Sequence, residues 1–514
     1  MGESRVKKSI LNAKVNGIFY FLTLAVSFVS RKVFLANLGD EFIGLTGTLN
    51  NFLSFLSLSE MGIGTAIAFN LYSPLQQGNR EKVSELISLI GYFFQKVGIF
   101  VGVSALGLSF FFPLIFADTQ LPYLLIFVTF YSQVCSALIT YLINYRQIVL
   151  AADQRNYVVA GYTQSLFLLK ILVQMILVYI YQNLYVWVLL EFLFSWLACI
   201  ALNWRINVNY PWLHVDLKRG KELMKRYPEV LRSSKQVFAH SLKDFAVNRC
   251  DQLLVFLYVS LDMVAHYGNY LLIITKSVGA FNAISGSMGA SIGHLVAEGD
   301  HRKIMKVFWE LMTMQLLIAG MLSFGFSFFI SPFIGLWLGE RYILSTTILA
   351  LLVVSNFLAK SLETIKSFNH AYGHYADVWS VWIEGGLFLG VTLCLAPFWG
   401  IAGVLIGRIS SLVFDLLWKP YYLFSAGLRV PTHIFWSGFL RNVSAFLVSF
   451  FLVYLLYCQL DIQITSWGSW IFNAVSFTGC FVTFYLLALL AWGWGAKDLL
   501  LRIPVFRNIF RKGL

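Results

Sequence analysis

Charged residues are scarce in this chain of 514 residues, where they make up only 12% of the sequence. An ordinary soluble protein has about 25% charged and 45 to 50% apolar residues, whereas 58% of this chain is hydrophobic. No stretch between the apolar segments is long enough for a sizeable soluble domain. The composition therefore excludes a water-soluble globular protein and indicates a chain that is embedded in lipid.

The motifs of common enzymes and metal sites are also missing. The six cysteines form no CxxC pair and have no metal-ligand spacing. No Walker A sequence is present, which argues against direct use of ATP. The chain has no nucleophile elbow and no large loop with paired carboxylates, which argues against an enzyme. His370 and His374 are four residues apart near Asp377, but without a HExxH motif they favour a structural role. We expect no cofactor, no metal site and no catalytic residue.

Apolar runs of about 20 residues recur along the whole chain, and each can cross a bilayer core of about 30 Å. The first run lacks the short apolar core and cleavage site of a signal peptide, so we expect it to be retained. Fourteen spans are predicted, at about 15–36, 43–72, 84–112, 123–146, 158–181, 185–204, 231–258, 265–294, 304–330, 343–369, 376–396, 401–424, 434–457 and 468–494.

The net charge of +13 does not indicate nucleic-acid binding, because the basic residues lie between apolar segments and form no basic domain. Basic loops, such as the one that carries Lys218 and Arg226, alternate with neutral or acidic loops, such as those that carry Asp118 and Asp461. Loops rich in Lys and Arg stay in the cytoplasm. We therefore expect a multi-pass protein of the bacterial cytoplasmic (inner) membrane with both termini in the cytoplasm.

The longest connection between spans is basic and has apolar residues at helical spacing, which predicts an interfacial helix between two halves. At an offset of 221 residues the halves partly match, as at Gly47 with Gly268 and Gly78 with Gly299. An even number of spans separates the matches, so the repeats have the same orientation. We predict an all-α fold of two parallel-repeat lobes around a central cavity. Its parts are an N-lobe at 1–205, the linker at 206–230, a C-lobe at 231–424, and two further spans with a basic tail at 425–514.

Ionisable side chains at bilayer depth cost several kcal/mol unless they face protein or a water-filled cavity, which makes them functional candidates. The seventh span has polar residues every four positions, and these lie on one helix face. They are Gln236, His240, Asp244, Asn248 and Gln252. Weaker polar stripes in the first and second spans predict that these three spans line the cavity.

Cations predominate among the candidates, and Arg and Lys form charge-assisted hydrogen bonds with phosphate. We predict that five cations bind an anionic substrate headgroup: Arg31, Lys243, Arg249, Lys276 and Arg408. Three carboxylates are candidates for coupling to protons or sodium: Glu60, Asp244 and Asp251. The alternative is that such residues form internal salt bridges, for example Lys243 with Asp251, or Lys360 with Glu363 or Glu384. Lys366 and Asp415 are further intramembrane candidates.

Two GxxxG pairs, Gly289 with Gly293 and Gly403 with Gly407, are of the kind that lets membrane helices pack closely.

Several short segments, in this order and spacing, resemble the Wzx-like polysaccharide flippases of the multidrug, oligosaccharidyl-lipid and polysaccharide exporter superfamily. The carriers of the resemblance are Leu38–Gly44, Leu58–Ala66, Asp251–Leu254, Tyr267–Tyr270, Ala290–Gly293, Pro332–Gly339 and Trp418–Tyr421. The similarity extends over nearly the whole chain. His294 stands where close relatives are expected to have Asn, and Arg249 with Cys250 replaces a smaller polar pair.

The resemblance implies a flippase that moves undecaprenyl-diphosphate-linked oligosaccharide repeat units from the cytoplasmic to the outer leaflet by alternating access. Such a protein would serve O-antigen, capsule or lipopolysaccharide synthesis, with a polysaccharide polymerase and other assembly proteins as partners. One alternative is a cation-coupled drug antiporter of the same superfamily, which would need a cavity dominated by carboxylates. Another is a membrane polymerase or acyltransferase, which would need a substantial catalytic loop.

Overall fold

The structure is a computed structural model that describes residues 5–57, 63–228, 251–285, 288–373, 378–460 and 462–502. These residues form helices joined by short connections, and no β-strand occurs among them. They divide into two compact units, Met1–Ala265 (unit 1) and His266–Leu514 (unit 2). The expected all-α polytopic membrane fold is confirmed.

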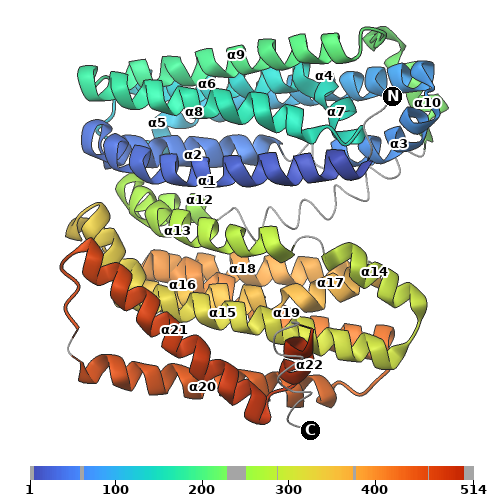
Figure 1. Ribbon diagram of the computed structural model, residues 1–514. Coiled ribbons are helices and arrows are strands. Elements are labelled where there is room, and N and C mark those ends of the chain that lie inside the picture. The colour runs from blue at the N-terminus through green and yellow to red at the C-terminus, as the bar shows by residue number, and fades with distance from the viewer. Residues whose placement is uncertain are drawn as a thin grey trace. The chain divides into compact units, whose positions relative to one another are not determined.

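Unit 1 is built around the long helix α4, whose apolar face packs against α6. From there, α6 packs on α9, α9 on α8 and α8 on α1, so the long helices run side by side (Figure 1). The elements of unit 1 are α1 (Arg5–Leu38), α2 (Asp40–Leu56), α3 (Ile63–Gln77), α4 (Arg80–Ser109), α5 (Phe112–Ile115), α6 (Tyr123–Leu142), η2 (Asn144–Gln147), α7 (Ile148–Ala152), α8 (Asn156–Tyr181), α9 (Leu184–Asn209), η3 (Leu217–Arg219), α10 (Gly220–Arg226) and α12 (Asp251–Tyr258).

Helix α13 (Leu261–Ser285) begins in unit 1 and continues into unit 2. In unit 2 the longest helix is α15, which packs on α16, α20, α21 and the short α22. The elements are α14 (Met288–Glu298), α15 (His301–Trp337), η4 (Glu340–Tyr342), α16 (Thr346–Ser361), α17 (Glu363–Ala371), α18 (Val378–Trp399), α19 (Ile401–Tyr422), the π-helical turn η5 (Leu423–Leu428), α20 (His433–Gln459), α21 (Trp467–Trp492) and α22 (Ala496–Leu501).

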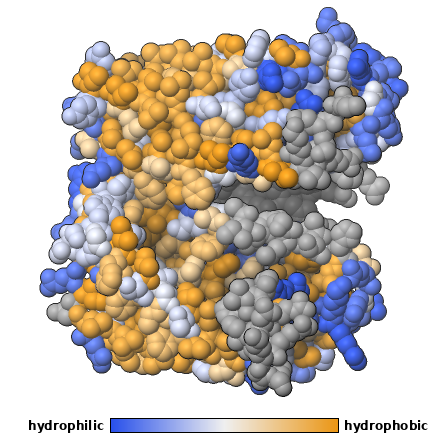
Figure 2. Space-filling model, viewed as in Figure 1, coloured by the Kyte–Doolittle hydropathy of each residue, from blue (hydrophilic) through white to orange (hydrophobic). Residues whose placement is uncertain are grey.

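Eleven helical segments among the described residues are long and apolar enough to cross a membrane. Each coincides with one of the predicted spans. The other three predicted spans, at 43–72, 231–258 and 265–294, each include residues outside the described part of the chain. The surface formed by the described helices is largely apolar, with hydrophilic residues gathered toward the helix ends (Figure 2). This distribution is the one that a lipid-embedded bundle requires.

The repeat in the sequence reappears in the places where helices begin. Helices α2 and α13 start 221 residues apart, at Asp40 and Leu261, and so do α4 and α15, at Arg80 and His301. Before each of the long helices stands a glycine with positive φ, Gly78 at +69° and Gly299 at +75°. The next residue, Asn79 or Asp300, accepts a hydrogen bond from the first turn. The two units therefore start their longest helices with the same glycine and cap.

Helices α18 and α19 approach each other closely at the Gly403 and Gly407 pair. A Cβ atom on Gly403 would lie 2.5 Å from the backbone nitrogen of Ala396, and one on Gly407 would lie 2.2 Å from Thr392 Oγ1. Only glycine permits this distance between the two backbones. The predicted close packing at this GxxxG pair is confirmed.

Candidate functional site

Five charged residues of unit 2 lie on helices that pack together within its apolar spans. We call them the interior cluster: Lys360 on α16, Glu363 and Lys366 on α17, and Asp415 and Lys419 on α19. Lys360, Asp415 and Lys419 are buried, and Asp415 has no exposed surface at all. Helix α19 contacts α16, α17 and α18, which brings the five side chains into one region of the unit.

Each charge of the interior cluster has a polar partner. Lys360 Nζ donates to Glu363 Oε1 at 2.8 Å and to Asn282 Oδ1 at 2.5 Å. Lys366 Nζ lies 2.8 Å from Asp415 Oδ2. The sequence-based alternative that Lys360 pairs internally with Glu363 is confirmed.

Lys419 links a fourth helix, α18, to the cluster. Its Nζ donates to Ser380 Oγ of α18 at 3.0 Å, and its backbone carbonyl accepts from Asn369 Nδ2 of α17 at 3.3 Å. Ser380 is fully buried. A polar network therefore links α17, α18 and α19 inside unit 2.

The Lys366–Asp415 pair combines a fully buried acid with an amine whose side chain is 35% exposed. A carboxylate in apolar surroundings costs several kcal/mol unless a cation or hydrogen bonds compensate it. Asp415 is therefore paired with Lys366, and Lys366 is the partly exposed member of the pair. Chemically, such a pair can respond to an incoming anion or proton, because either one competes with one of the partners.

Three of the five predicted substrate cations belong to the described residues. Arg31 lies on α1, where its Nη2 donates to the carbonyl oxygen of Ala265 at 2.9 Å. Lys276 on α13 and Arg408 on α19 are half-buried. Arg408 lies two turns before Asp415 on the same helix. The other two, Lys243 and Arg249, lie outside the described residues, so the five-cation site stays a prediction.

The predicted coupling carboxylates also stay predictions. Glu60 and Asp244 lie outside the described residues, and Asp251 is the first residue of α12, with its side chain outside them. Among the described residues, no group of three or more His, Cys, Asp or Glu side chains is arranged to hold a metal ion.

Unit 1 contains a cavity of about 600 Å³ whose lining includes acidic residues from three separate parts of the chain. Glu41 of α2, Asp118 and Asp262 contribute carboxylates. Glu41 Oε1 accepts from the Thr119 hydroxyl at 2.5 Å and from the Gln120 backbone N–H at 2.8 Å. These three acids are far apart in the sequence, and the fold brings them together. Their negative charge disfavours a phosphate and favours a cation.

An apolar groove of about 580 Å³ runs between α6 and α9. Its walls include Phe127, Tyr131, Leu189 and Phe192, and almost no polar surface is present. Such a surface suits a hydrocarbon chain, because no polar group there would lose its hydrogen bonds to water.

Sequence reasoning did not identify two acids of unit 1, the half-buried Asp153 and the buried Glu85. Asp153 binds Lys8 Nζ at 2.7 Å, Arg155 Nε at 2.9 Å and the Tyr210 hydroxyl at 2.8 Å. Burial, together with the charge of Asp153, raises the pKa of Tyr210. The second acid, Glu85 on α4, is 5% exposed and binds residues of the segment that includes α10. In the sequence, the only indication of these ion pairs was that each acid lies close to a loop predicted to be basic.

No protein-family model and no curated protein matches this sequence. Solved structures do match the fold. The lipid II flippase MurJ, in an inward closed conformation, aligns over 92% of this chain and 99% of its own, with a TM-score of 0.64 and 14% identity. An inward-facing multidrug resistance MATE family transporter of the MOP superfamily aligns over 81% of this chain and 99% of its own, with a TM-score of 0.54 and 14% identity.

A MATE transporter from Vibrio cholerae aligns over 82% of this chain and 99% of its own, with a TM-score of 0.51 and 16% identity. At identities this low, the structural matches establish the arrangement of the helices but not the substrate or the mechanism. This chain therefore has the polytopic helical fold of the MurJ lipid flippase and of the MATE transporters of the MOP superfamily.

Proposed function

We propose that this protein is a flippase that moves undecaprenyl-diphosphate-linked oligosaccharide repeat units from the cytoplasmic to the outer leaflet of a bacterial inner membrane. The observation that carries the proposal is the similarity of fold to a lipid II flippase over 92% of the chain. The excess of Lys and Arg over acids among the polar residues of the spans agrees with an anionic substrate. Transport proceeds by alternating access and supplies a polymerase and other assembly proteins outside.

The substrate diphosphate is received by Arg31, Lys243, Arg249, Lys276 and Arg408. A guanidinium group can form two parallel hydrogen bonds with a phosphate, whereas an ammonium group acts as a point charge. Both interactions are stronger in a site with little water than at a surface. The hydrocarbon tail stays in lipid, where apolar surfaces such as the groove between α6 and α9 suit it.

Carboxylates couple transport of the substrate to a proton or sodium ion. Glu60, Asp244 and Asp251 are placed by sequence on polar faces of the second and seventh spans, where uptake or release of a proton or sodium ion changes the local charge. A change of charge at membrane depth is large compared with the few kcal/mol that separate two conformations. It would therefore shift the equilibrium between the two states.

The experiment is complementation of a deletion strain. Deletion should leave lipid-linked repeat units in the inner leaflet, and normal surface polysaccharide after deletion would contradict the proposal. Alanine variants of the five cations, tested one at a time, should abolish flipping while keeping the wild-type melting temperature in detergent. Lys303→Ala is the matched control, because Lys303 is half-exposed and paired with the equally exposed Glu298. If all five variants complement normally, the cationic site is wrong.

A second candidate function is export of organic cations. The cavity lined by Glu41, Asp118 and Asp262 favours it, because carboxylates attract cations, and the fold is also that of MATE transporters. Greater sensitivity of the deletion strain to cationic dyes, with unchanged surface polysaccharide, would select this function over the flippase.

The membrane orientation is tested separately from the substrate. Reporters fused after Lys512 and inserted near Arg219 should lie in the cytoplasm, and one inserted near Asp461 should lie outside. A C-terminus on the outer side would contradict the fourteen-span arrangement, whatever the substrate.

A further inference from the structure

Helix α10 is packed tightly onto the beginning of α4. A Cβ atom on Gly220 would lie 2.2 Å from Cγ of Tyr92, so the two helices touch at this glycine. Leu223, one turn further along α10, is 1% exposed and belongs to the apolar core of unit 1. One face of this short helix is therefore fixed against α4.

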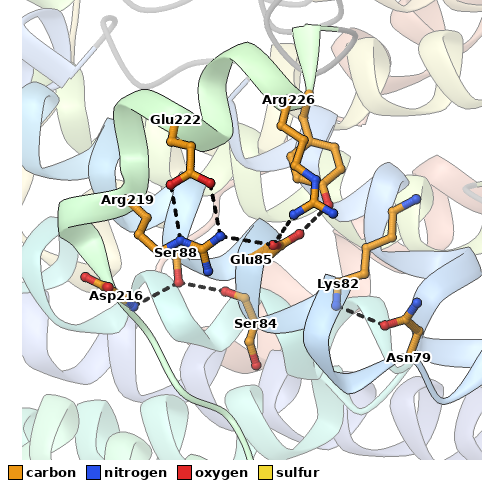
Figure 3. A network of polar contacts seen from close by, with 10 residues as sticks. Asn79, Lys82, Ser84, Glu85, Ser88, Asp216, Arg219, Glu222 and Arg226 are labelled. Atoms are coloured by element: carbon orange, nitrogen blue, oxygen red, sulfur yellow. Dashed lines mark hydrogen bonds and ion pairs between the residues drawn. The ribbon is translucent and has the colours of Figure 1, made fainter.

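Polar contacts fix the same helix at both of its ends (Figure 3). At its beginning, the backbone N–H of Asp216 donates to Ser88 Oγ at 3.0 Å. At its end, the buried carboxylate of Glu85 accepts from Arg226 Nη1 and from the Tyr227 hydroxyl, both at 2.5 Å. Helix α10 is thus held against α4 as a part of unit 1, and its opposite face points away from α4.

The arginines of this segment are engaged within the protein. Arg226 is paired with Glu85, and Arg219 lies 3.2 Å from Glu222 and 3.5 Å from Glu85 (Figure 3). The hydrogen bond and charge of Glu222 raise the pKa of Arg219, and those of Arg219 lower the pKa of Glu222. The two arginines are therefore both in ion pairs with acids of unit 1.

The lysines of the segment are not engaged in this way. Lys218, Lys221 and Lys225 are exposed, and none of them has an ion-pair partner among the residues that the structure describes. Spacings of three and four residues place them on one side of the helix, roughly opposite Gly220 and Leu223. They form a positively charged face, which we call the lysine face.

The lysine face lies where two membrane spans end. Helix α4 begins at Arg80 and α9 ends at Asn209, and the segment that follows α9 leads directly into η3 and α10. Arg80 lies over the ring of Trp212, 5.6 Å from its centroid, and tryptophan is a residue type enriched where spans meet the headgroups. Figure 2 shows hydrophilic surface at the end of unit 1 that carries α10 in Figure 1, beside the apolar surface of the spans.

We propose that Lys218, Lys221 and Lys225 form a binding surface for the phosphate headgroups of anionic phospholipids. The alternation of basic and acidic loops predicts that this end faces the cytoplasm, where anionic lipids attract basic residues next to a span. Three ammonium groups in a row at headgroup height are complementary to several lipid phosphates at once. The surface holds the α10 segment of unit 1 against the membrane, and this role does not depend on which substrate the protein carries.

The test uses the purified full-length protein in nanodiscs made from phosphatidylcholine with a minority of phosphatidylglycerol. Native mass spectrometry measures how many molecules of each lipid remain bound. The wild type should retain phosphatidylglycerol preferentially, and K218Q/K221Q/K225Q should lose at least tenfold of that preference, since one lysine near an anionic surface contributes about fivefold. The matched control K218R/K221R/K225R keeps the charge and should keep the preference.

Two further measurements make the result specific. The preference should weaken as ionic strength rises, and inorganic phosphate at the same concentration as the lipid should not displace phosphatidylglycerol. The glutamine variant should melt at the wild-type temperature in phosphatidylcholine alone, because the three side chains are exposed. An unchanged preference in the glutamine variant overturns the proposal and would leave the lysine face to an acidic protein partner.

Discussion

Glu85 in unit 1 and Asp415 in unit 2 are both buried carboxylates on long helices, yet their surroundings differ. Glu85 lies in the second turn of α4 and is reached by two exposed arginines and the hydroxyl of Tyr227. Asp415 lies well inside α19, and Lys366 lies 2.8 Å from it. Two arginines of an exposed segment pair with Glu85. Asp415 instead pairs with a lysine within the membrane span.

Buried carboxylates therefore have two roles in this fold. Near the end of a span, the acid fastens a surface helix, and the arginines that bind it keep contact with water. Inside a span, the charge must be balanced locally, since no solvent can compensate a lost partner. A change of one partner should therefore be felt more strongly at Asp415 than at Glu85, and three sets of variants test this.

Lys366→Met should have the largest effect. It leaves Asp415 buried without that cation, which costs about 3 kcal/mol, the lower end of the usual range because Lys366 is partly exposed. The measurement is thermal unfolding in detergent. Adding Asp415→Asn should recover most of the loss, because a neutral side chain no longer needs a cation. A double variant no more stable than the single one would contradict the internal ion pair.

Glycine replacements compare how neighbouring helices pack against α19, which carries Asp415, and against α4, which carries Glu85. Gly403→Ala should cost about 2 kcal/mol, because its Cβ meets the backbone of Ala396, which cannot rotate away. Gly220→Ala should cost a similar amount, since its Cβ would lie 2.2 Å from Cγ and 2.5 Å from Cβ of Tyr92, the part of that side chain next to the backbone. Gly390→Ala on α18 is the control, with no atom of the described residues within 4 Å of its Cβ. Equal melting temperatures for the Gly403 and Gly390 variants would refute the close approach of α18 and α19.

Glu85→Gln should have the smallest effect, about 1.5 kcal/mol, because the amide keeps one hydrogen-bond acceptor and the arginines remain hydrated. The control is Glu222→Gln, whose carboxylate is 63% exposed and whose surface ion pair should contribute little to stability. Both are measured by thermal unfolding. A loss for Glu85→Gln as large as that for Lys366→Met would remove the distinction between the two acids.

Several features of the fold were accessible from the sequence because they depend on local pattern. The apolar runs predicted eleven spans that the described residues confirm. The match of Gly78 with Gly299 was part of the predicted repeat, and the spacing of Gly403 and Gly407 indicated a close helix contact. Lys360 and Glu363 are three residues apart, so their pairing could be foreseen on one helical face.

Other contacts could not be foreseen, because their partners are distant in the chain. Lys8 and Asp153 are 145 residues apart, and Arg226 and Glu85 are 141 apart. Lys366 and Asp415 were both recognised as intramembrane candidates, but nothing in the sequence paired them with each other. The five-cation site has the same difficulty, since its members come from different helices and two of them lie outside the described residues.

The sequence by itself determined which segments are helices, which of them can cross a membrane, and where basic residues collect between them. It could do so because hydropathy, helical spacing and capping act within a few residues of each other. Only the tertiary structure decided that Glu85 fastens α10, that Asp415 is balanced by Lys366, and that Lys218, Lys221 and Lys225 are left facing outward. Which charge finds which partner depends on how helices far apart in the chain pack together, and on which side chains that packing removes from solvent.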